Sequence, residues 1–343
     1  MIGAAVSAIF VALFLRRIDV GGVADAFRDA NVLLILLALA VYFAGTYMRA
    51  VRWHYLMQPI KPVPPHKLYP IVAIGYATNN VLPFRTGEIV RAHVLNRRHG
   101  VSRTAGLSNI FIERVFDGLM LTVFLCVGVA ASLVGFQGMR YAGDLLLAAM
   151  AFLAFGVSAA FALLYATAKY PDAAERVVRR VTARLPVLRR FDSGWVQSVT
   201  TGLAPAKDKR IFVAGLWTSA VAWGLEAFMY FLVGEAFGLD QPFPVYLLIA
   251  AAANIIITAP STSGGVGPFE WAAKEVLLIF LVAENAEEVA IAYAASLHGL
   301  VLIPMTVLGL LLLWLYQVPL GRVAKGGDVR QQEAEARPEP QPR

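Results

Sequence analysis

The sequence has little charge and almost no cysteine. Of its 343 residues only 15% are charged, and the single cysteine is Cys126. Because soluble domains carry about 25% charged residues, this composition argues against a soluble enzyme. One cysteine excludes a disulfide framework and a cysteine-rich zinc or iron–sulfur site. What the chain has instead is apolar side chains, with 58% hydrophobic residues and a mean hydropathy of +0.64.

Catalytic and nucleotide-binding motifs are also missing. The five histidines form no H-E-x-x-H motif and no group with metal-ligand spacing, and there is no G-x-S-x-G turn. We therefore expect no enzyme activity, no cofactor and no metal. The net charge of +7 does not indicate a nucleic-acid partner, because the basic residues mostly flank apolar segments, as they do in membrane proteins.

Long apolar runs predict an all-α, polytopic integral membrane protein. A membrane span needs about 20 apolar residues. Five segments meet this requirement, namely 32–57, 106–134, 144–168, 210–236 and 289–317. A sixth, 2–15, is short, and it lacks the basic start and the cleavage site of a signal peptide. We interpret it as a thin first span; the alternative is that the true start of the chain lies upstream of Met1. About six spans are expected in a membrane domain covering residues 1–317.

Two further apolar stretches are interrupted by proline and glycine. The first, 68–95, contains Pro83 and Gly87, and the second, 243–282, contains Pro260 and Gly267. Proline removes a backbone donor and glycine weakens a helix, so neither stretch is expected to be one continuous helix. Since non-helical backbone at membrane depth is tolerated only inside protein or beside a water-filled cavity, both are predicted to be re-entrant broken hairpins.

The basic residues predict the orientation. With both termini in the cytoplasm, 24 of the 30 Lys and Arg residues lie inside, as the positive-inside rule requires. The first hairpin then enters from the cytoplasm and the second from the opposite face. Matching interrupted segments in two halves of opposite orientation are typical of an inverted repeat with a transporter's binding site at its centre. The alternative is a chance likeness between two turns.

Three ionisable residues, Glu113, Arg114 and Asp117, lie within the predicted 106–134 span. Such groups are rare and costly in a membrane. Their spacing of three and four residues lets neighbouring members meet on one helix face. They are candidate substrate-binding residues, and the alternative is an internal ion pair that only packs the bundle.

The first break offers a candidate anion site. Glu88 and Arg91 are three residues apart at the start of the returning helix, so they can pair. Arg85 and Arg91 could together hold an anionic headgroup, because guanidinium groups bind phosphate in a two-pronged manner. The alternative is that both arginines are interfacial anchors. Asn80 is the remaining candidate at this break.

The second break combines hydroxyls with glycines before a helix that is expected to begin near Pro268. Free backbone N–H groups in such a segment can form an anion-binding nest. Glu270 would lie in the first helical turn, equivalent to Glu88. Glu226, in the 210–236 span, and Glu270 are candidates for proton coupling or, alternatively, buried hydrogen-bonded carboxylates. The candidate binding residues at the break itself are Ser261, Ser263, Gly264, Gly265, Gly267 and Glu270.

Two segments are predicted to lie outside the membrane. The basic connection 169–209 contains a stretch, 173–195, that alternates valine and leucine with arginine, as an amphipathic helix on anionic lipid would. A plain solvated loop is the alternative. The tail 318–343 is rich in Pro, Glu, Gln and Arg and is predicted to be a disordered cytoplasmic tail.

Four motifs occur in a fixed order along the chain. They are Arg49-x-x-Arg52-Trp53, Asn80-x-x-Pro83-x-x-x-Gly87-Glu88-x-x-Arg91, Glu113-Arg114-x-x-Asp117 and Pro260-x-x-x-Gly264-Gly265-x-Gly267-x-x-Glu270. This combination resembles the flippase-like transmembrane domain of the lysylphosphatidylglycerol synthase family, over about residues 1–317. The resemblance implies a multi-pass protein of a prokaryotic cytoplasmic membrane that moves or handles a lipid between leaflets. Since only 26 residues follow Gln317, the aminoacyl-transferase domain of the bifunctional members is expected to be absent.

Two functions follow as hypotheses. The first is a flippase-like protein that translocates a lipid with an anionic or phosphate-linked headgroup, so that membrane lipids are its partners. The second is a non-transporting accessory that organises a separate envelope-lipid enzyme. A membrane-embedded enzyme is disfavoured, because no nucleophile–base pair is visible.

Overall fold

The computed structural model describes residues 20–82, 86–135, 208–258, 263–281 and 285–317, with single residues at 170, 176 and 205. Every regular element in these ranges is helical. The predicted spans at 2–15 and 144–168 and the tail at 318–343 lie outside the described residues. So does the basic connection at 169–209 with its 173–195 stretch, apart from those single positions and residues 208–209.

Four long helices form the frame of the molecule. They are α3 (Val32–Met57), α6 (Arg103–Gly135), α10 (Lys209–Ala236) and α13 (Ala286–Leu315). Asn31 caps α3 by accepting from the Leu33 N–H at 3.0 Å, and Asp208 caps α10 in the same way. A short helix, α2 (Val20–Asp29), precedes α3. The helices therefore begin and end close to the boundaries that hydropathy predicts.

Three of the long helices, α3, α10 and α13, are long and apolar enough to cross a membrane. Their outer faces expose large apolar side chains, including Leu33, Trp217, Val307 and Trp314. Water does not favour such a surface, whereas lipid does. The spans predicted at 32–57, 210–236 and 289–317 are confirmed as membrane-compatible helices, and the segment 106–134 is helical within α6.

Both interrupted stretches are broken, as the proline and glycine pattern predicts. The first consists of α4 (Pro65–Val81) and α5 (Gly87–His99). The second consists of α11 (Phe243–Ile256), a 3-10 turn η3 (Ser263–Gly265) and α12 (Pro268–Leu278). The Asn79 side chain closes the first break by accepting from the Gly87 N–H at 2.8 Å. In the second, Gly264 has a φ of 70°, a conformation that glycine adopts at low cost.

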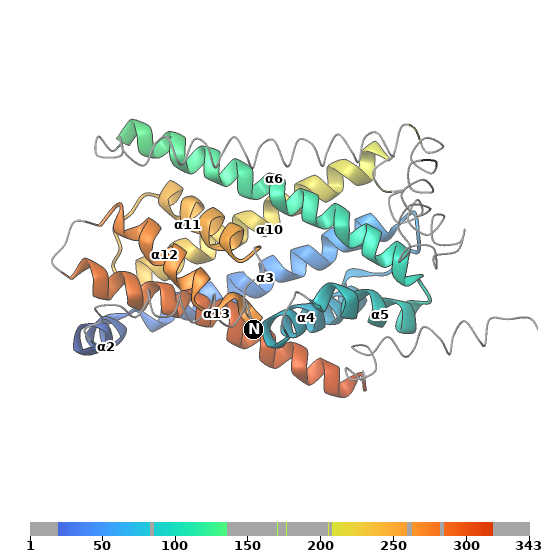
Figure 1. Ribbon diagram of the computed structural model, residues 1–343, viewed down its shortest axis with the longest axis horizontal. Coiled ribbons are helices and arrows are strands. Elements are labelled where there is room, and N and C mark those ends of the chain that lie inside the picture. The colour runs from blue at the N-terminus through green and yellow to red at the C-terminus, as the bar shows by residue number, and fades with distance from the viewer. Residues whose placement is uncertain are drawn as a thin grey trace, which may run out of the picture.

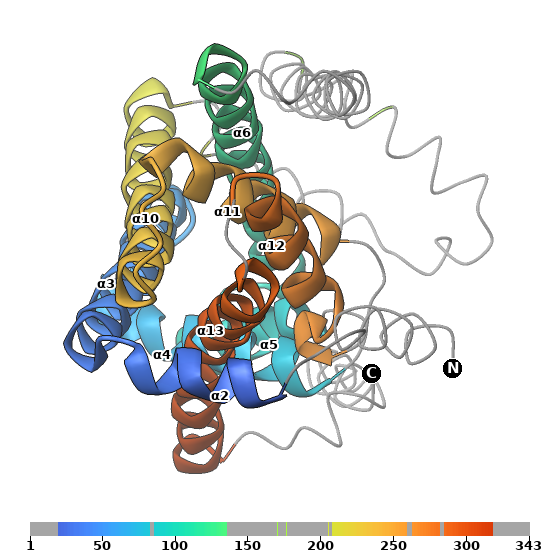
Figure 2. The same cartoon turned by 90° about the vertical axis from the view of Figure 1, so that its left-hand side faces the viewer.

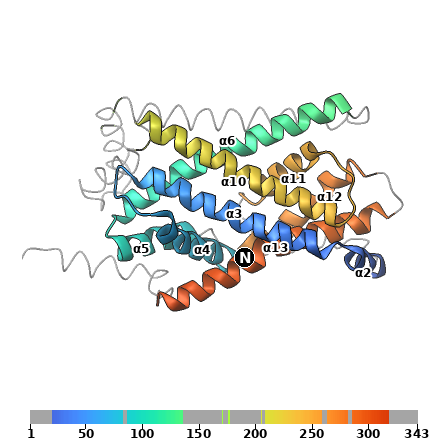
Figure 3. The ribbon, with the colours of Figure 1, turned by 180° about the vertical axis from the view of Figure 1, so that it is seen from behind.

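Within the described residues, one order of helices occurs twice. A long helix, two short helices around a break and a second long helix form α3–α4–α5–α6, and the same order recurs in α10–α11–α12–α13. The packing between these halves is reciprocal: α4 lies against α13, α11 lies against α6, and α3 packs along α10. Figure 3 shows α3 and α10 side by side, and Figure 2, along the bundle, shows α11 and α12 between α6 and α13.

One glycine in each half allows a short helix of the other half to pack closely. A Cβ atom on Gly309 of α13 would lie 2.3 Å from the Ala73 carbonyl oxygen of α4. A Cβ atom on Gly128 of α6 would lie 2.3 Å from Leu248 of α11. Both glycines are thus needed for helix backbones to approach closely, as small residues do in membrane bundles.

The broken pairs lie at opposite ends of the long axis. Figure 1 shows α4 and α5 toward one end, where α3 ends and α6 and α10 begin, and α11 and α12 toward the other, where α13 begins. The first of these ends carries basic residues such as Arg97, Arg98 and Lys209, whereas Glu287 and Glu288 begin α13 at the second. The two breaks meet between these ends, as the site below shows.

Candidate functional site

A cluster of buried charged residues lies where α3, α5, α6 and α10 meet. Side chains from four helices contribute four arginines and four carboxylates, which are Arg49, Arg52, Glu88, Arg91, Glu113, Arg114, Asp117 and Glu226. Their formal charges therefore cancel. Burial of an ion is costly unless a partner offsets it, and every member here has one. We call this set the charge cluster.

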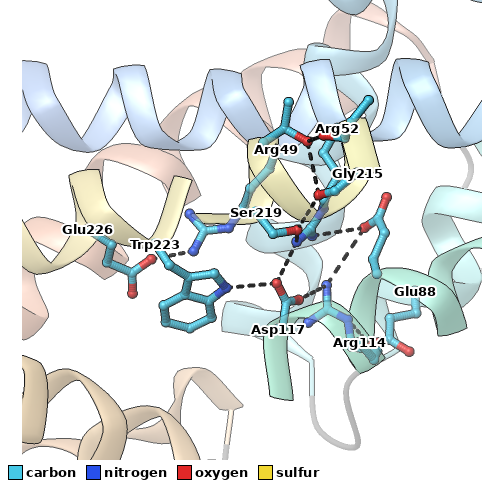
Figure 4. Close-up of polar contacts among 12 residues, drawn as sticks. Arg49, Arg52, Glu88, Arg114, Asp117, Gly215, Ser219, Trp223 and Glu226 are labelled. Atoms are coloured by element: carbon cyan, nitrogen blue, oxygen red, sulfur yellow. Dashed lines mark hydrogen bonds and ion pairs between the residues drawn. The ribbon is translucent and has the colours of Figure 1, made fainter. Parts of the chain in front are cut away.

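Asp117 of α6 lies at the centre of the charge cluster (Figure 4). It accepts hydrogen bonds from Arg52 at 2.6 Å and from the indole N–H of Trp223 at 2.9 Å, and Arg114 lies 3.4 Å away. Arg52 is completely buried and also donates to Ser219 of α10 at 3.1 Å. Asp117 thus ties α6 to both α3 and α10.

Arg91 has a partner that the spacing does not predict. The pairing expected between Glu88 and Arg91 is wrong: Arg91 donates to both oxygens of Glu113, at 3.0 and 3.2 Å. Its guanidinium also lies over the Trp53 ring, 4.1 Å from the centroid. The physical reason is that Arg91 faces the bundle interior, where a fully buried carboxylate needs a two-pronged partner. Arg91 is therefore already neutralised by protein.

Glu226 is paired as well. Arg49 of α3 donates to one oxygen of Glu226, and the amide of Asn254 in α11 donates to the other at 3.4 Å. Asn254 also donates to the Tyr230 hydroxyl at 3.2 Å. Glu226 thus lies in a hydrogen-bonded interior position, the alternative that sequence reasoning kept open beside proton coupling.

The open edge of the charge cluster is formed by Arg114 and Glu88. Their side chains are 32% and 30% exposed, and Arg114 Nε lies 3.6 Å from the Glu88 carboxylate. This contact is the longest and the most exposed of those that join α5 to α6 in the cluster. Part of each side chain therefore reaches the surface, whereas the Arg91–Glu113 and Arg52–Asp117 pairs behind them are buried.

The Glu270 carboxylate forms hydrogen bonds within the second break. Glu270 accepts from the Gly267 N–H at 2.8 Å and lies 2.7 Å from Nδ1 of His298 in α13. The other ring nitrogen of His298, Nε2, lies 3.0 Å from the Gly264 carbonyl oxygen. The Glu270 carboxylate thus accepts from one of the N–H groups that could otherwise form an anion-binding nest. Its negative charge is also favoured by the dipole of α12, because it lies at the N-terminus of that helix.

The two breaks touch each other. A Cβ atom on Gly264 would lie 3.3 Å from the Asn80 carbonyl oxygen and 3.7 Å from its Cα atom. The Asn80 amide donates to Thr306 of α13 at 2.8 Å, and Leu302 contacts Gly264 from the same helix. Helix α13 therefore holds both breaks together, although they are some 180 residues apart in the chain.

The structure sorts the predicted site residues into two groups. Glu88, Arg91, Glu113, Arg114, Asp117 and Glu226 belong to the charge cluster. Asn80, Gly264, Gly267 and Glu270 lie at the meeting of the breaks, with Gly265 and the backbone of Ser263 in η3. Arg85 and Ser261 lie outside the described residues.

Sequence reasoning missed several contributors. Arg49 and Arg52 stand three apart in an apolar span, a signal as strong as that of Arg114, yet they are not among the predicted site residues. His298 is not among the predicted site residues either; it lies in the interior of α13 and stacks on Phe269 at 4.4 Å. Ser219 and Trp223 carry no sequence signal. Within the described ranges, no three His, Cys, Asp or Glu side chains gather as a metal site requires.

Comparison with known proteins gives relatives among membrane proteins. Two proteins of Methanothermobacter thermautotrophicus, each called a UPF0104 membrane protein, are 26% and 22% identical to this chain. The first alignment covers 80% of this chain and 82% of the relative, and the second covers 73% and 75%. No solved structure matches the chain significantly.

A third relative is larger. The glycosyltransferase AglD of Haloferax volcanii is 26% identical over 319 residues, which is 86% of this chain but half of that protein. The model of one protein family, the lysylphosphatidylglycerol synthase TM region, matches residues 1–309. That match covers nearly all of residues 1–317, the membrane domain that the sequence predicts. The chain therefore belongs to the lysylphosphatidylglycerol synthase transmembrane-region family.

Proposed function

We propose that this protein translocates a lipid with an anionic, phosphate-linked headgroup between the leaflets of a prokaryotic cytoplasmic membrane. The observation that carries the proposal is the contact between the two breaks, in which Gly264 lies against Asn80. Broken helices that meet near mid-membrane form the substrate sites of many transporters. Transport, rather than enzyme activity, is therefore the function that we assign.

The proposed topology has six spans, two re-entrant hairpins and both termini in the cytoplasm. The repeated element order and the reciprocal packing of α4 on α13 and α11 on α6 support an inverted repeat. The basic residues at one end of the bundle support the orientation, since cytoplasmic ends carry an excess of Lys and Arg.

Arg114 is the cation that we assign to the headgroup. The buried pairs Arg91–Glu113 and Arg52–Asp117 form its framework, whereas Arg114 and Glu88 are separated by 3.6 Å and reach the surface of the charge cluster. A phosphate oxygen can replace Glu88 as the partner of Arg114, because both are anions and guanidinium favours phosphate geometry. Arg85, which lies outside the described residues, is a second cation that the sequence offers for the headgroup.

Reconstituted full-length protein tests the proposal. Liposomes carrying headgroup-labelled phosphatidylglycerol should show faster transfer between leaflets than protein-free liposomes, and labelled phosphatidylcholine should move less. Glu270→Gln should abolish the transfer, and Arg114→Gln, which removes the cation assigned to the headgroup, should strongly reduce it. The matched control is Arg28→Ala, which breaks an exposed ion pair with Asp25. Wild-type protein that leaves the transfer rate unchanged would contradict transport.

A second candidate function is that of an accessory to a lipid-modifying enzyme. It is favoured by the relative AglD, half of which aligns with this chain and whose name is that of a glycosyltransferase. A region of this kind thus occurs in one polypeptide with further sequence. Co-purification of a separate envelope-lipid enzyme, combined with no lipid transfer by the isolated protein, would support this second function over the first.

A further inference from the structure

His298 and Glu270 form an isolated polar pair in the interior of the second half. Their side chains are 6% and 14% exposed, and Nδ1 of the imidazole lies 2.7 Å from the carboxylate. The Phe269 ring stacks on the imidazole at 4.4 Å, with an angle of 19° between the planes. Both ring nitrogens face acceptors, because Nε2 lies 3.0 Å from the Gly264 carbonyl oxygen.

This geometry defines the number of protons that the pair holds. The Gly264 carbonyl can only accept, so Nε2 must carry a hydrogen. The contact between Nδ1 and the carboxylate oxygen also needs one hydrogen, whichever of the two atoms holds it. The pair therefore contains one proton more than a neutral imidazole beside a carboxylate. Its net charge is zero, as burial favours.

We propose that His298 and Glu270 are a proton-binding site whose occupancy locks the contact between the two breaks. Loss of the proton leaves one N–H on the ring for two acceptors, so either the link to Gly264 or the link to Glu270 must break. The step moves one proton from the contact between Nδ1 and the carboxylate to water and changes no covalent bond between heavy atoms. Because Gly264 lies against Asn80, release of either link loosens the meeting of the breaks.

The corresponding pair in the first half has an arginine in the place of the histidine. Glu88 begins α5 as Glu270 begins α12, and its partner Arg114 follows 26 residues later, whereas His298 follows Glu270 after 28. Arginine does not lose its proton in proteins, but histidine changes charge between about pH 5 and 8. The asymmetry makes the second break the proton-sensitive one.

Other charged groups on the neighbouring helices have partners of their own. Lys274 of α12 pairs with Glu275 and Glu287, at 3.3 and 3.6 Å. On α10, Glu226 pairs with Arg49. The other titratable or charged side chains on the neighbouring helices include several tyrosines and groups close to the helix ends. These are Tyr42 of α3, Tyr76, His66 and Lys67 of α4, Tyr230 of α10, Tyr246 of α11, Glu288 and Tyr293 of α13, and Asp25, Arg28 and Asp29 of α2.

The lock can be tested without transport. In full-length protein carrying Cys126→Ala, a cysteine is placed at Val266, which is 41% exposed beside the second break, or at the exposed Lys61 as a reference. The probe is a water-soluble maleimide. At pH values below the midpoint of a one-proton release, the labelling rate at position 266 divided by that at position 61 should rise about tenfold for each unit by which the pH increases. In His298→Asn the ratio should not depend on pH.

Two variants sharpen this experiment. Glu270→Gln should keep labelling slow at every pH, because its amide can donate to Nδ1 as the protonated pair does. His66→Asn, a change of an exposed histidine, should behave as wild type. A pH-independent ratio in the wild type, or an unchanged pH dependence in His298→Asn, would overturn the proton site.

The role of the site in transport rests on the proposed function. A pH gradient across the liposome membrane should change wild-type lipid transfer severalfold and should have no such effect in His298→Asn. Transfer by the wild type that ignores the gradient would reject proton coupling while leaving the flippase function intact. Absence of all transfer would reject the flippase function, and the labelling experiment would still decide whether the proton lock exists.

Discussion

Arg91 and Glu113 form a two-pronged ion pair, with N–O distances of 3.0 and 3.2 Å, between helices that follow each other in the chain. Trp53 covers the guanidinium from α3. The pair therefore locks α5 to α6 and presents no free charge to a ligand. The ion pairs of the charge cluster thus differ in role. The buried pairs hold the helices together, whereas the Arg114–Glu88 pair is partly exposed at the surface of the cluster.

Removal of one member of the buried pair should destabilise the protein strongly. Arg91→Ala leaves the buried Glu113 with only longer contacts to Arg52 and Arg114, at 3.6 and 3.9 Å, and Glu113→Ala leaves Arg91 without its two-pronged partner. Removal of one member of a buried pair costs about 3–5 kcal/mol. Thermal unfolding in detergent should show a clearly lower midpoint for each variant. The double variant should lose less stability than the two single losses added together, because the residues are coupled. Strict additivity would contradict the pairing.

Arg114 should behave differently from Arg91. Arg114→Gln removes a cation that is 32% exposed, so the loss of stability should stay near 1 kcal/mol or below. Transfer of an anionic headgroup should nevertheless fall at least tenfold if Arg114 contacts phosphate, since about 1.4 kcal/mol of lost binding in the transition state suffices for that factor. Retention of full transfer in a well-folded Arg114→Gln protein would remove Arg114 from the site.

The meeting of the breaks should depend on the absence of a side chain at Gly264. Gly264→Ala combines a φ of 70° with a contact of 2.6 Å to Leu302, whereas Gly100→Ala has a φ of 68° and open space around it. The backbone strain is thus matched, at roughly 1 kcal/mol in each case. We expect Gly264→Ala to abolish lipid transfer and Gly100→Ala to retain it, as measured in liposomes. Equal activities would show that the contact is dispensable.

The orientation can be tested with single cysteines. On a Cys126→Ala background, Lys61→Cys should react only with reagents that reach the cytoplasmic face, and Glu287→Cys only with impermeant reagents added outside. The reason is that the two residues lie at opposite ends of the bundle, and the basic end is retained in the cytoplasm. Labelling of intact cells and of inverted vesicles gives the comparison, and the reverse pattern would invert the proposed topology.

Local rules predicted the helices well. Asn31 and Asp208 cap helices where apolar runs begin, and Pro268 starts α12 because its missing N–H costs nothing in the first turn. Spacing along one helix also predicted that Arg114 meets Asp117, which the structure confirms at 3.4 Å. The same rule failed for Arg91, because a partner on another helix offered better geometry than Glu88.

The sequence by itself determined that the chain is a membrane protein made of long apolar helices and two broken ones, since hydropathy, proline and glycine act locally. Only the tertiary structure decided which charges pair. Arg49 with Glu226, Arg91 with Glu113 and Glu270 with His298 join different helices, and such pairs depend on how the helices pack. In a medium without water, each buried charge takes the best partner that packing brings near, wherever that partner lies in the chain.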